Sequence, residues 1–214
     1  MKTFPNAAKG IKNVYKAEIL DLYSILAVVL GTIFVVCSIA TGSVGGIVIL
    51  SLFGILITLG SLVLSIIAFV KMLTGLKAAS IDDDTFRKAL ICVIVSLGVE
   101  IIAAILSSFV KSTVGNDIAS IISRIADLGA TYFILNGCST LLQQRGETQL
   151  AASGKNTLNM ILVLFGISIL FRIIPLFILS LVGDIIFLIL YAIVSIIAYV
   201  KYLAFLKHAS ENLA

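Results

Sequence analysis

The sequence predicts an all-α integral membrane protein with six transmembrane helices. Of its 214 residues, 60% are hydrophobic and only 12% are charged, whereas a soluble domain carries about 25% charged residues. The apolar residues form long runs, each close to the roughly 20 residues that a helix needs to cross a bilayer. A membrane β-barrel is disfavoured because its strands alternate apolar and polar residues, while residues 27–40 and 185–200 are apolar on every face.

The predicted spans follow one another with short connections. They cover approximately residues 22–40, 45–73, 89–110, 117–142, 157–182 and 185–206. The fourth span is the least apolar, since it contains Arg124, Asp127 and Asn136. Before the first span, residues 1–21 carry four lysines and no cleavable signal. This cytoplasmic segment is amphipathic, and it forms either an ordinary lysine-rich flank or a helix that lies on the anionic cytoplasmic leaflet.

The basic residues predict the orientation of the chain. Twelve of the 15 Lys and Arg residues fall on one side of a six-span arrangement. They are Lys2, Lys9, Lys12, Lys16, Lys71, Lys77, Arg87, Lys88, Arg145, Lys155, Lys201 and Lys207. Because cytoplasmic loops are enriched in Lys and Arg, both termini are expected in the cytoplasm. Removing the fourth span would scatter these charges over both faces.

An internal similarity predicts three tandem helical hairpins. Residues 65–80, SIIAFVKMLTGLKAAS, align without gaps to residues 195–210, SIIAYVKYLAFLKHAS, with eleven of sixteen positions identical. A weaker third copy surrounds Ala130 and Gly137 near the end of the fourth span. The single transmembrane domain, residues 1–214, would then consist of hairpins at about 22–80, 86–143 and 155–210. Repeated units of this kind often place a binding site at their mutual interface.

Four ionisable residues lie within the predicted spans. They are Glu100 in the third, Arg124 and Asp127 in the fourth, and Arg172 in the fifth. Counted along their helices, all four lie at a similar depth. An isolated charge at the centre of a span costs about 3 kcal/mol, so we expect these residues to face the bundle interior and to pair. They would form either a transport pathway or proton relay, or a structural ion-pair network between the second and third hairpins.

Two local motifs are expected to shape the structure. Asp82, Asp83 and Asp84 precede the third span, where carboxylates favour the positively polarised N-terminal end of a helix. In the second span, small residues recur at intervals of three or four and would allow close approach of another helix. They are Gly54, Thr58, Ser61 and Ser65.

No set of residues predicts a catalytic centre, a metal site or a cofactor. Cys37, Cys92 and Cys138 each stand alone in an apolar run, which argues against a disulfide framework or a metal cluster. The single histidine, His208, has no nucleophile or acid fixed near it by spacing. We therefore expect no enzyme, and no nucleic acid partner.

Two classes of function fit these features. The first is a small solute or ion transporter, or the membrane subunit of a transport system. Its energy would come from a gradient or a partner, because no predicted connection is long enough to form a domain of its own. The second is a structural or regulatory membrane protein whose charges only fix helix packing. Either could bind another membrane protein or a second copy. The absence of tryptophan, the short loops and the small size favour a bacterial inner membrane.

Overall fold

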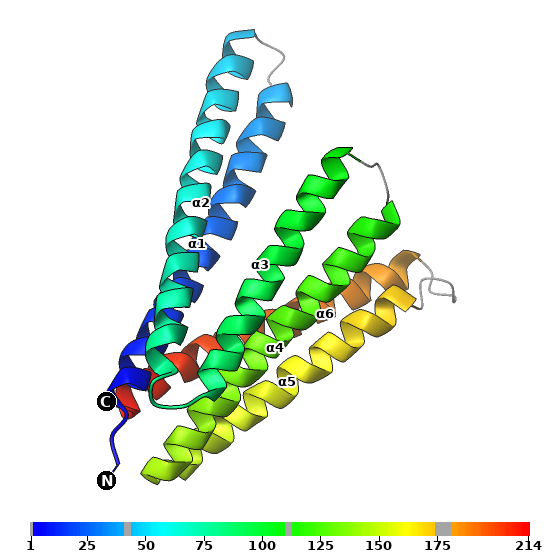
Figure 1. Ribbon diagram of the computed structural model, residues 1–214. Helices are drawn as coiled ribbons and strands as arrows, with labels where there is room; N and C mark the ends of the chain where they lie inside the picture. Colours follow the sequence, from blue (N-terminus) through cyan, green and yellow to red (C-terminus); the bar gives the residue numbers. More distant parts are fainter. Residues whose placement is uncertain (1, 41–43, 110–112, 174–180) are drawn as a thin grey trace. The chain divides into compact units, whose positions relative to one another are not determined.

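A computed structural model describes residues 2–40, 44–109, 113–173 and 181–214 (Figure 1). All regular structure in these ranges is α-helical: α1 (Pro5–Ala40), α2 (Val44–Ala79), α3 (Thr85–Phe109), α4 (Thr113–Arg145), α5 (Thr148–Ile173) and α6 (Leu181–Asn212). Each of the six described helices contains a stretch long and apolar enough to cross a membrane. The predicted all-helical, multi-pass membrane protein is thereby confirmed.

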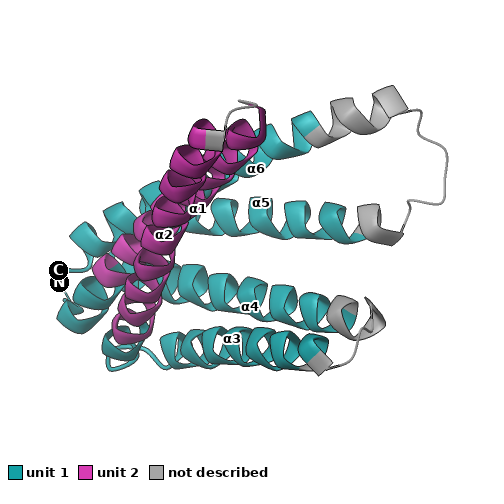
Figure 2. Cartoon of the chain, turned by 90° about the horizontal axis from the view of Figure 1, so that it is seen from above, with its two compact units in different colours: residues 1–11, 76–214 teal, residues 12–75 magenta. Residues whose placement is uncertain are grey.

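The chain divides into two compact units, coloured separately in Figure 2. Unit 1 consists of residues 1–11 and 76–214, and unit 2 of residues 12–75. Unit 1 therefore holds α3 to α6 together with the first turns of α1 and the last turn of α2. Unit 2 is the remainder of the α1–α2 hairpin.

In unit 2, α1 and α2 approach closely where small residues face each other. A Cβ atom on Gly31 would lie 2.9 Å from the Gly54 carbonyl oxygen, and one on Gly54 would lie 2.8 Å from that of Gly31. Farther along the pair, the Ser24 hydroxyl donates to the Ser61 carbonyl oxygen at 3.0 Å and lies 2.6 Å from the Ser65 hydroxyl. The predicted small-residue contact surface of the second span is confirmed by these distances.

In unit 1, α3, α4, α5 and α6 lie side by side in chain order (Figure 2). The fully buried core lies at one end, where α3 and α5 begin and α4 and α6 end. Its largest side chains include Ile11, Leu76, Phe86, Ile134, Leu135, Leu142, Leu206 and Leu213. The Phe86 ring packs so tightly on α4 that a Cβ atom on Gly137 would come within 2.9 Å of it. Tight side-chain packing is thus concentrated at the ends of the spans.

Two of the three aspartates before α3 cap two different helices. The Thr85 amide donates to Asp83 Oδ1 at 2.7 Å, which confirms local capping at the start of α3. The Asp82 carboxylate instead accepts from the Asn6 side chain at 3.0 Å and from the Ala7 amide at 2.7 Å. Since Ala7 lies in the first turn of α1, Asp82 satisfies a backbone donor that this helix cannot satisfy itself. The aspartate loop therefore ties the start of α1 into unit 1.

The N-terminal segment is helical from Pro5 and continues without interruption into the apolar part of α1. Its apolar side chains Phe4, Ile11 and Val14 are buried, and the Phe4 amide donates to the Leu213 carbonyl oxygen at 3.1 Å. These side chains are buried, whereas the four lysines of residues 1–21 are exposed and could face a leaflet. The predicted contact of this segment with the membrane surface stays a prediction.

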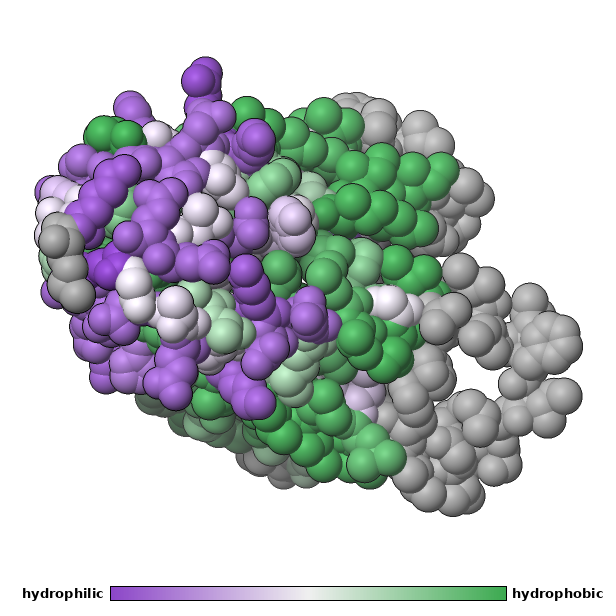
Figure 3. Space-filling view, turned by 90° about the horizontal axis from the view of Figure 1, so that it is seen from below, coloured by the Kyte–Doolittle hydropathy of each residue, from purple (hydrophilic) through white to green (hydrophobic). Residues whose placement is uncertain are grey.

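Most apolar side chains along the spans are exposed. Leu56 is 63% exposed, Ile102 59% and Ile196 64%. Figure 3 shows hydrophilic residues gathered at one end of the molecule, with hydrophobic residues beyond them. Exposed apolar surface of this extent suits hydrocarbon, because lipid tails are as apolar as leucine. The protein is therefore built for contact with a lipid bilayer.

Equivalent positions of the two similar sequence segments are buried alike. Leu76 and its counterpart Leu206 are both 0% exposed, as are Ala79 and Ala209. The similarity thus extends from residue identity to the face that each helix end buries. The hairpin repeat itself and the arrangement of three tandem hairpins stay predictions.

The contact between α1 and α2 predicts a difference between two glycines of α2. Gly54→Ala should lower the free energy of unfolding by about 1–3 kcal/mol, because the new methyl group must displace the α1 backbone. Gly60→Ala is the matched control, since a Cβ atom there meets nothing within 4 Å. Unfolding of both variants in mixed detergent micelles measures the difference. Equal stability of the two variants would contradict the close approach at Gly54.

Candidate functional site

A row of polar residues lies between α3 and α4, within their apolar spans. Ser96 and Glu100 are four residues apart on α3, and Ser123 and Asp127 are four apart on α4, so each pair shares a helix face. Glu100 lies fifteen residues after Thr85, the start of α3, or roughly 22 Å along the helix axis at 1.5 Å per residue. The row is therefore far from both ends of the helix.

Two serine hydroxyls lie between the two carboxylates. The Ser123 hydroxyl donates to Glu100 Oε1 at 2.7 Å. Ser96 Oγ lies 2.9 Å from Ser123 Oγ and 3.4 Å from the Ser123 carbonyl oxygen, and Asp127 follows Ser123 by one helical turn on α4. Both serines are buried. Hydrogen bonds thus join Glu100, Ser123 and Ser96, with Asp127 next in the row, and we call these four residues the carboxylate–serine chain.

The carboxylate–serine chain borders a cavity of about 540 Å³ between α3 and α4. Its charged and hydroxyl-bearing lining residues are Glu100, Ser107, Ser120, Ser123, Arg124 and Asp127. Alanines complete the wall, so no bulky side chain fills the space. Because a water molecule takes about 30 Å³ in the liquid, the cavity has room for a small hydrated ion or a small polar solute.

The charged residues meet at this cavity without forming close ion pairs. Among the side chains that the structure describes, no ion pair joins Arg124 to Glu100 or Asp127; the Glu100 carboxylate accepts from Ser123 instead. All three charged residues are exposed in the isolated chain. The Arg172 side chain lies outside the described residues. The predicted four-residue network therefore stays a prediction, although three of its members line one cavity.

The carboxylate–serine chain has one more possible hydrogen-bond link than it has serine hydrogens, so one additional proton would complete it. Two links are hydrogen bonds in the structure, a third would form if the Ser96 hydroxyl turned to Asp127, and each serine supplies one hydrogen. With both carboxylates ionised, two hydrogens serve three links. If one carboxyl group is protonated, every link has a hydrogen, and one of the two neighbouring negative charges is removed. Reversing all the hydrogen bonds would transfer the protonated state from Glu100 to Asp127, so the arrangement is suited to proton transfer.

Sequence reasoning identified the charges but not the two serines that connect them. The available signal was their helical spacing, because Ser96 precedes Glu100, and Ser123 precedes Asp127, by four residues. Serine is common in packed membrane helices, so the spacing alone does not separate a relay from ordinary packing. Only the pairing of α3 with α4 brings the two serine hydroxyls together.

The other residues considered from sequence form no comparable site. Cys37, Cys92 and Cys138 are free thiols. His208 Nδ1 lies 3.5 Å from a Glu211 carboxylate oxygen. In the ranges that the structure describes, no three His, Cys, Asp or Glu side chains lie close enough together to hold a metal ion.

Comparison with known proteins adds no family. The chain matches no family model, no curated protein and no solved structure at a significant level. The features of the chain that bear on function are therefore the cavity between α3 and α4 and the membrane-spanning helices around it.

The serine contacts predict an energetic coupling between α3 and α4. Ser96→Ala and Ser123→Ala should each lower the free energy of unfolding by about 0.5–1.5 kcal/mol. A double-mutant cycle should give a coupling near 0.6 kcal/mol, the average for such pairs in membrane proteins. Ser107→Ala is the control, because its hydroxyl donates to the Ala104 carbonyl oxygen of its own helix. Additive effects of the two substitutions would argue against the hydrogen bond.

Proposed function

We propose that this polytopic membrane protein moves a proton or another small cation across the bilayer through the cavity between α3 and α4. The observation that carries the proposal is the carboxylate–serine chain, two acids and two hydroxyls gathered in the apolar part of the spans. Acidic side chains inside membrane spans mark ion pathways and proton relays. The cavity volume adds room for water or a solute beside this chain.

The charges at the cavity favour a cation over an anion. Glu100 and Asp127 supply two carboxylates, whereas Arg124 supplies one guanidinium group. With both acids ionised, the cavity carries a net formal charge of −1, so one proton or one monovalent cation neutralises it. A charged group at the centre of a span costs about 2.5–3.5 kcal/mol. Binding of that cation would therefore neutralise a charge whose presence within the span is unfavourable.

The proposal needs no catalytic centre and no motor domain. The connections between helices are too short for a domain of their own, so energy would come from an ion gradient or from another protein. In the latter case the chain would be the membrane subunit of a larger transport system. Purification in mild detergent followed by mass spectrometry distinguishes a self-contained transporter from a subunit. A subunit should be recovered with its partner in fixed stoichiometry.

The alternative is a structural or regulatory membrane protein. The buried serine contacts favour it, since Ser96 and Ser123 join α3 to α4 whether or not an ion moves. In that case Glu100 would serve only as an acceptor for the Ser123 hydroxyl. If the protein is a transporter, neutralisation of Glu100 should change ion flux alone. If the protein is structural or regulatory, the same change should alter helix packing together with any activity.

Neutralising either acid should reduce proton flux. In liposomes containing the purified protein, a pH-sensitive dye inside the vesicles reports flux driven by a potassium diffusion potential. Glu100→Gln and Asp127→Asn should each slow the flux at least roughly tenfold, which corresponds to a barrier increase of about 1.4 kcal/mol. The physical reason is that each substitution removes one end of the carboxylate–serine chain.

Glu147→Gln is the control for that experiment, because Glu147 lies in the turn between α4 and α5. Thermal stability in detergent should be measured for the same variants. Slower flux with unchanged stability supports transport, while a parallel loss of stability supports the structural alternative. Flux that is equal in the wild type and both cavity variants would rule out a proton pathway through this cavity.

We further propose that both termini face the cytoplasm and that the membrane is a bacterial inner membrane. The support is the concentration of Lys and Arg on one side of the spans. A reporter enzyme that is active only in the cytoplasm should therefore be active when fused after Ala214. A periplasm-dependent reporter at the same position should be inactive. The opposite pattern would overturn the predicted orientation.

A further inference from the structure

A second cavity lies in unit 1 between the start of α5 and the end of α6. Its volume is about 380 Å³, and it shares no lining residue with the α3–α4 cavity. Six polar or cationic side chains line it: Gln149, Ser153, Asn156, Thr157, Lys201 and His208. Leu150, Ala204 and Phe205 supply an apolar wall.

The charge and hydrogen-bonding groups of this cavity suit an anion. Lys201 supplies a positive charge and His208 an imidazole, while α5 contributes three side chains that can donate hydrogen bonds to a ligand; the Thr157 hydroxyl already donates to the Ser153 carbonyl oxygen at 2.9 Å. None of the described residues that line it is acidic. Because α5 begins at Thr148, the cavity also lies beside the positively polarised N-terminal end of this helix.

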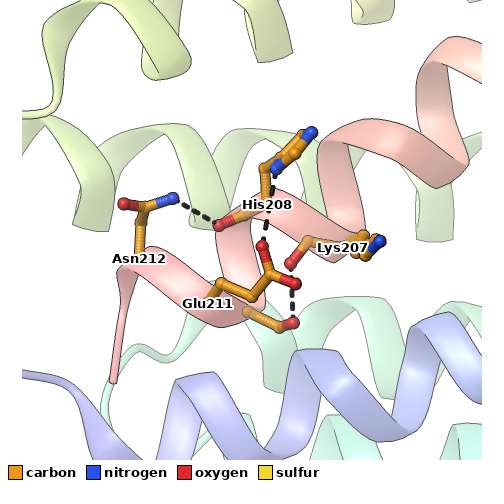
Figure 4. Close-up of polar contacts among 5 residues, drawn as sticks. Lys207, His208, Glu211 and Asn212 are labelled. Atoms are coloured by element: carbon orange, nitrogen blue, oxygen red, sulfur yellow. Dashed lines mark hydrogen bonds and ion pairs between the residues drawn. The ribbon is translucent and has the colours of Figure 1, made fainter.

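Side-chain hydrogen bonds cap backbone carbonyls around His208 at the end of α6, while the His208 side chain is 57% exposed (Figure 4). Asn212 Nδ2 donates to the His208 carbonyl oxygen at 2.9 Å, and the Ser210 hydroxyl donates to the Lys207 carbonyl oxygen at 2.8 Å. The Glu211 carboxylate approaches Nδ1 of the His208 ring at 3.5 Å. Nε2 lies on the other side of the ring from Glu211, which leaves it as the nitrogen for a ligand.

The position of the cavity along the helices corresponds to a membrane–water interface. On α6, Lys201 directly follows the apolar run that ends at Val200. On α5, the polar residues that line the cavity precede the apolar run that starts at Met160. Beyond the cavity, Val163 is 62% exposed and Ile196 64% exposed. A phosphate at the cavity would thus lie at headgroup level, with apolar protein surface beside its acyl chains.

We propose that this cavity binds a phosphate group, presented by the headgroup of an anionic phospholipid. The lysine, the imidazole and the hydroxyl and amide donors would contact the phosphate oxygens, and the apolar wall would contact the glycerol and the first methylene groups. Soluble phosphate offers the same oxygens without the acyl chains. The site would be a lipid-binding site, independent of whether the α3–α4 cavity conducts ions.

The sequence similarity between α2 and α6 supports a role specific to α6. The two similar segments differ at five positions, and three of these, Ala204, Phe205 and His208, line the cavity. Their counterparts in α2 are Thr74, Gly75 and Ala78. The cavity therefore lies where the sequence of α6 differs most from the similar segment of α2. Lys201 is unchanged, because its counterpart in α2 is Lys71.

The test uses the full-length protein in detergent with phosphatidylglycerol and phosphatidylcholine of identical acyl chains. Native mass spectrometry counts the lipids that remain bound. We expect phosphatidylglycerol to be retained over phosphatidylcholine and Lys201→Ala to weaken its binding about fivefold, the effect of one basic residue at a lipid surface. Lys207→Ala and Lys71→Ala are matched controls that remove the same charge outside the cavity, and neither should change retention.

Ala204→Asp provides a second variant, since it places a negative charge in the cavity and leaves Lys201 intact. It should also weaken phosphatidylglycerol binding. Displacement of the lipid by inorganic phosphate would support the phosphate site and assign it to a soluble ligand, whereas lipid retention in excess phosphate would assign it to the headgroup. Equal retention by the wild type, Lys201→Ala and Ala204→Asp would overturn the proposal. An equal loss in Lys201→Ala and Lys207→Ala would also overturn it, since it would reflect general surface charge.

Discussion

Apolar side chains gain almost nothing by leaving lipid for one another, because the lipid tails are as apolar as the side chains. The structure follows this constraint closely. In the spans, contact between helices relies on small residues and hydroxyl groups, as between Gly31 and Gly54 in unit 2. Large buried side chains such as Phe86 and Leu206 gather instead at one end of unit 1, where water is available to drive their burial.

The same constraint makes hydrogen bonds between polar groups important for helix association within the spans. A hydroxyl that leaves a neighbouring helix finds no water in hydrocarbon, so interhelical contacts such as that between Ser96 and Ser123 persist. A carboxylate attached to such a pair gains a hydrogen-bond donor in the form of the Ser123 hydroxyl. The hydrogen bonds of the carboxylate–serine chain therefore stabilise the α3–α4 contact, and the proposed proton path would use the same atoms.

The end of unit 1 that holds the buried core also holds its most polar features. The aspartate loop caps both α1 and α3 there, and the cavity with Lys201 and His208 opens between α5 and α6. Ions and lipid headgroups can approach this end from water without a desolvation cost comparable to that in the spans. The protein thus separates two kinds of polar site: a hydrated cationic one at the interface and an acidic one within the spans.

Much of this arrangement follows directly from sequence. The six spans are readable because twenty apolar residues in a row are compatible with a bilayer and with little else. The charges of Glu100, Arg124 and Asp127 stand out because charge is costly in hydrocarbon. A cap at Thr85 was predictable from its neighbouring aspartates, since capping is a local interaction between residues two or three apart.

Other features required the tertiary structure, because they join residues distant in sequence. Nothing near Asp82 indicates that it caps α1, 75 residues away, and nothing near Ser96 indicates a partner on the next helix. The cavity beside Lys201 depends on where the start of α5 meets the end of α6. The sequence by itself determined which segments enter the membrane, through their transfer free energy. Only the packing of one helix against another decided which polar side chains meet. These contacts depend on the rotation and register of each helix, and an almost uniformly apolar sequence encodes rotation and register weakly.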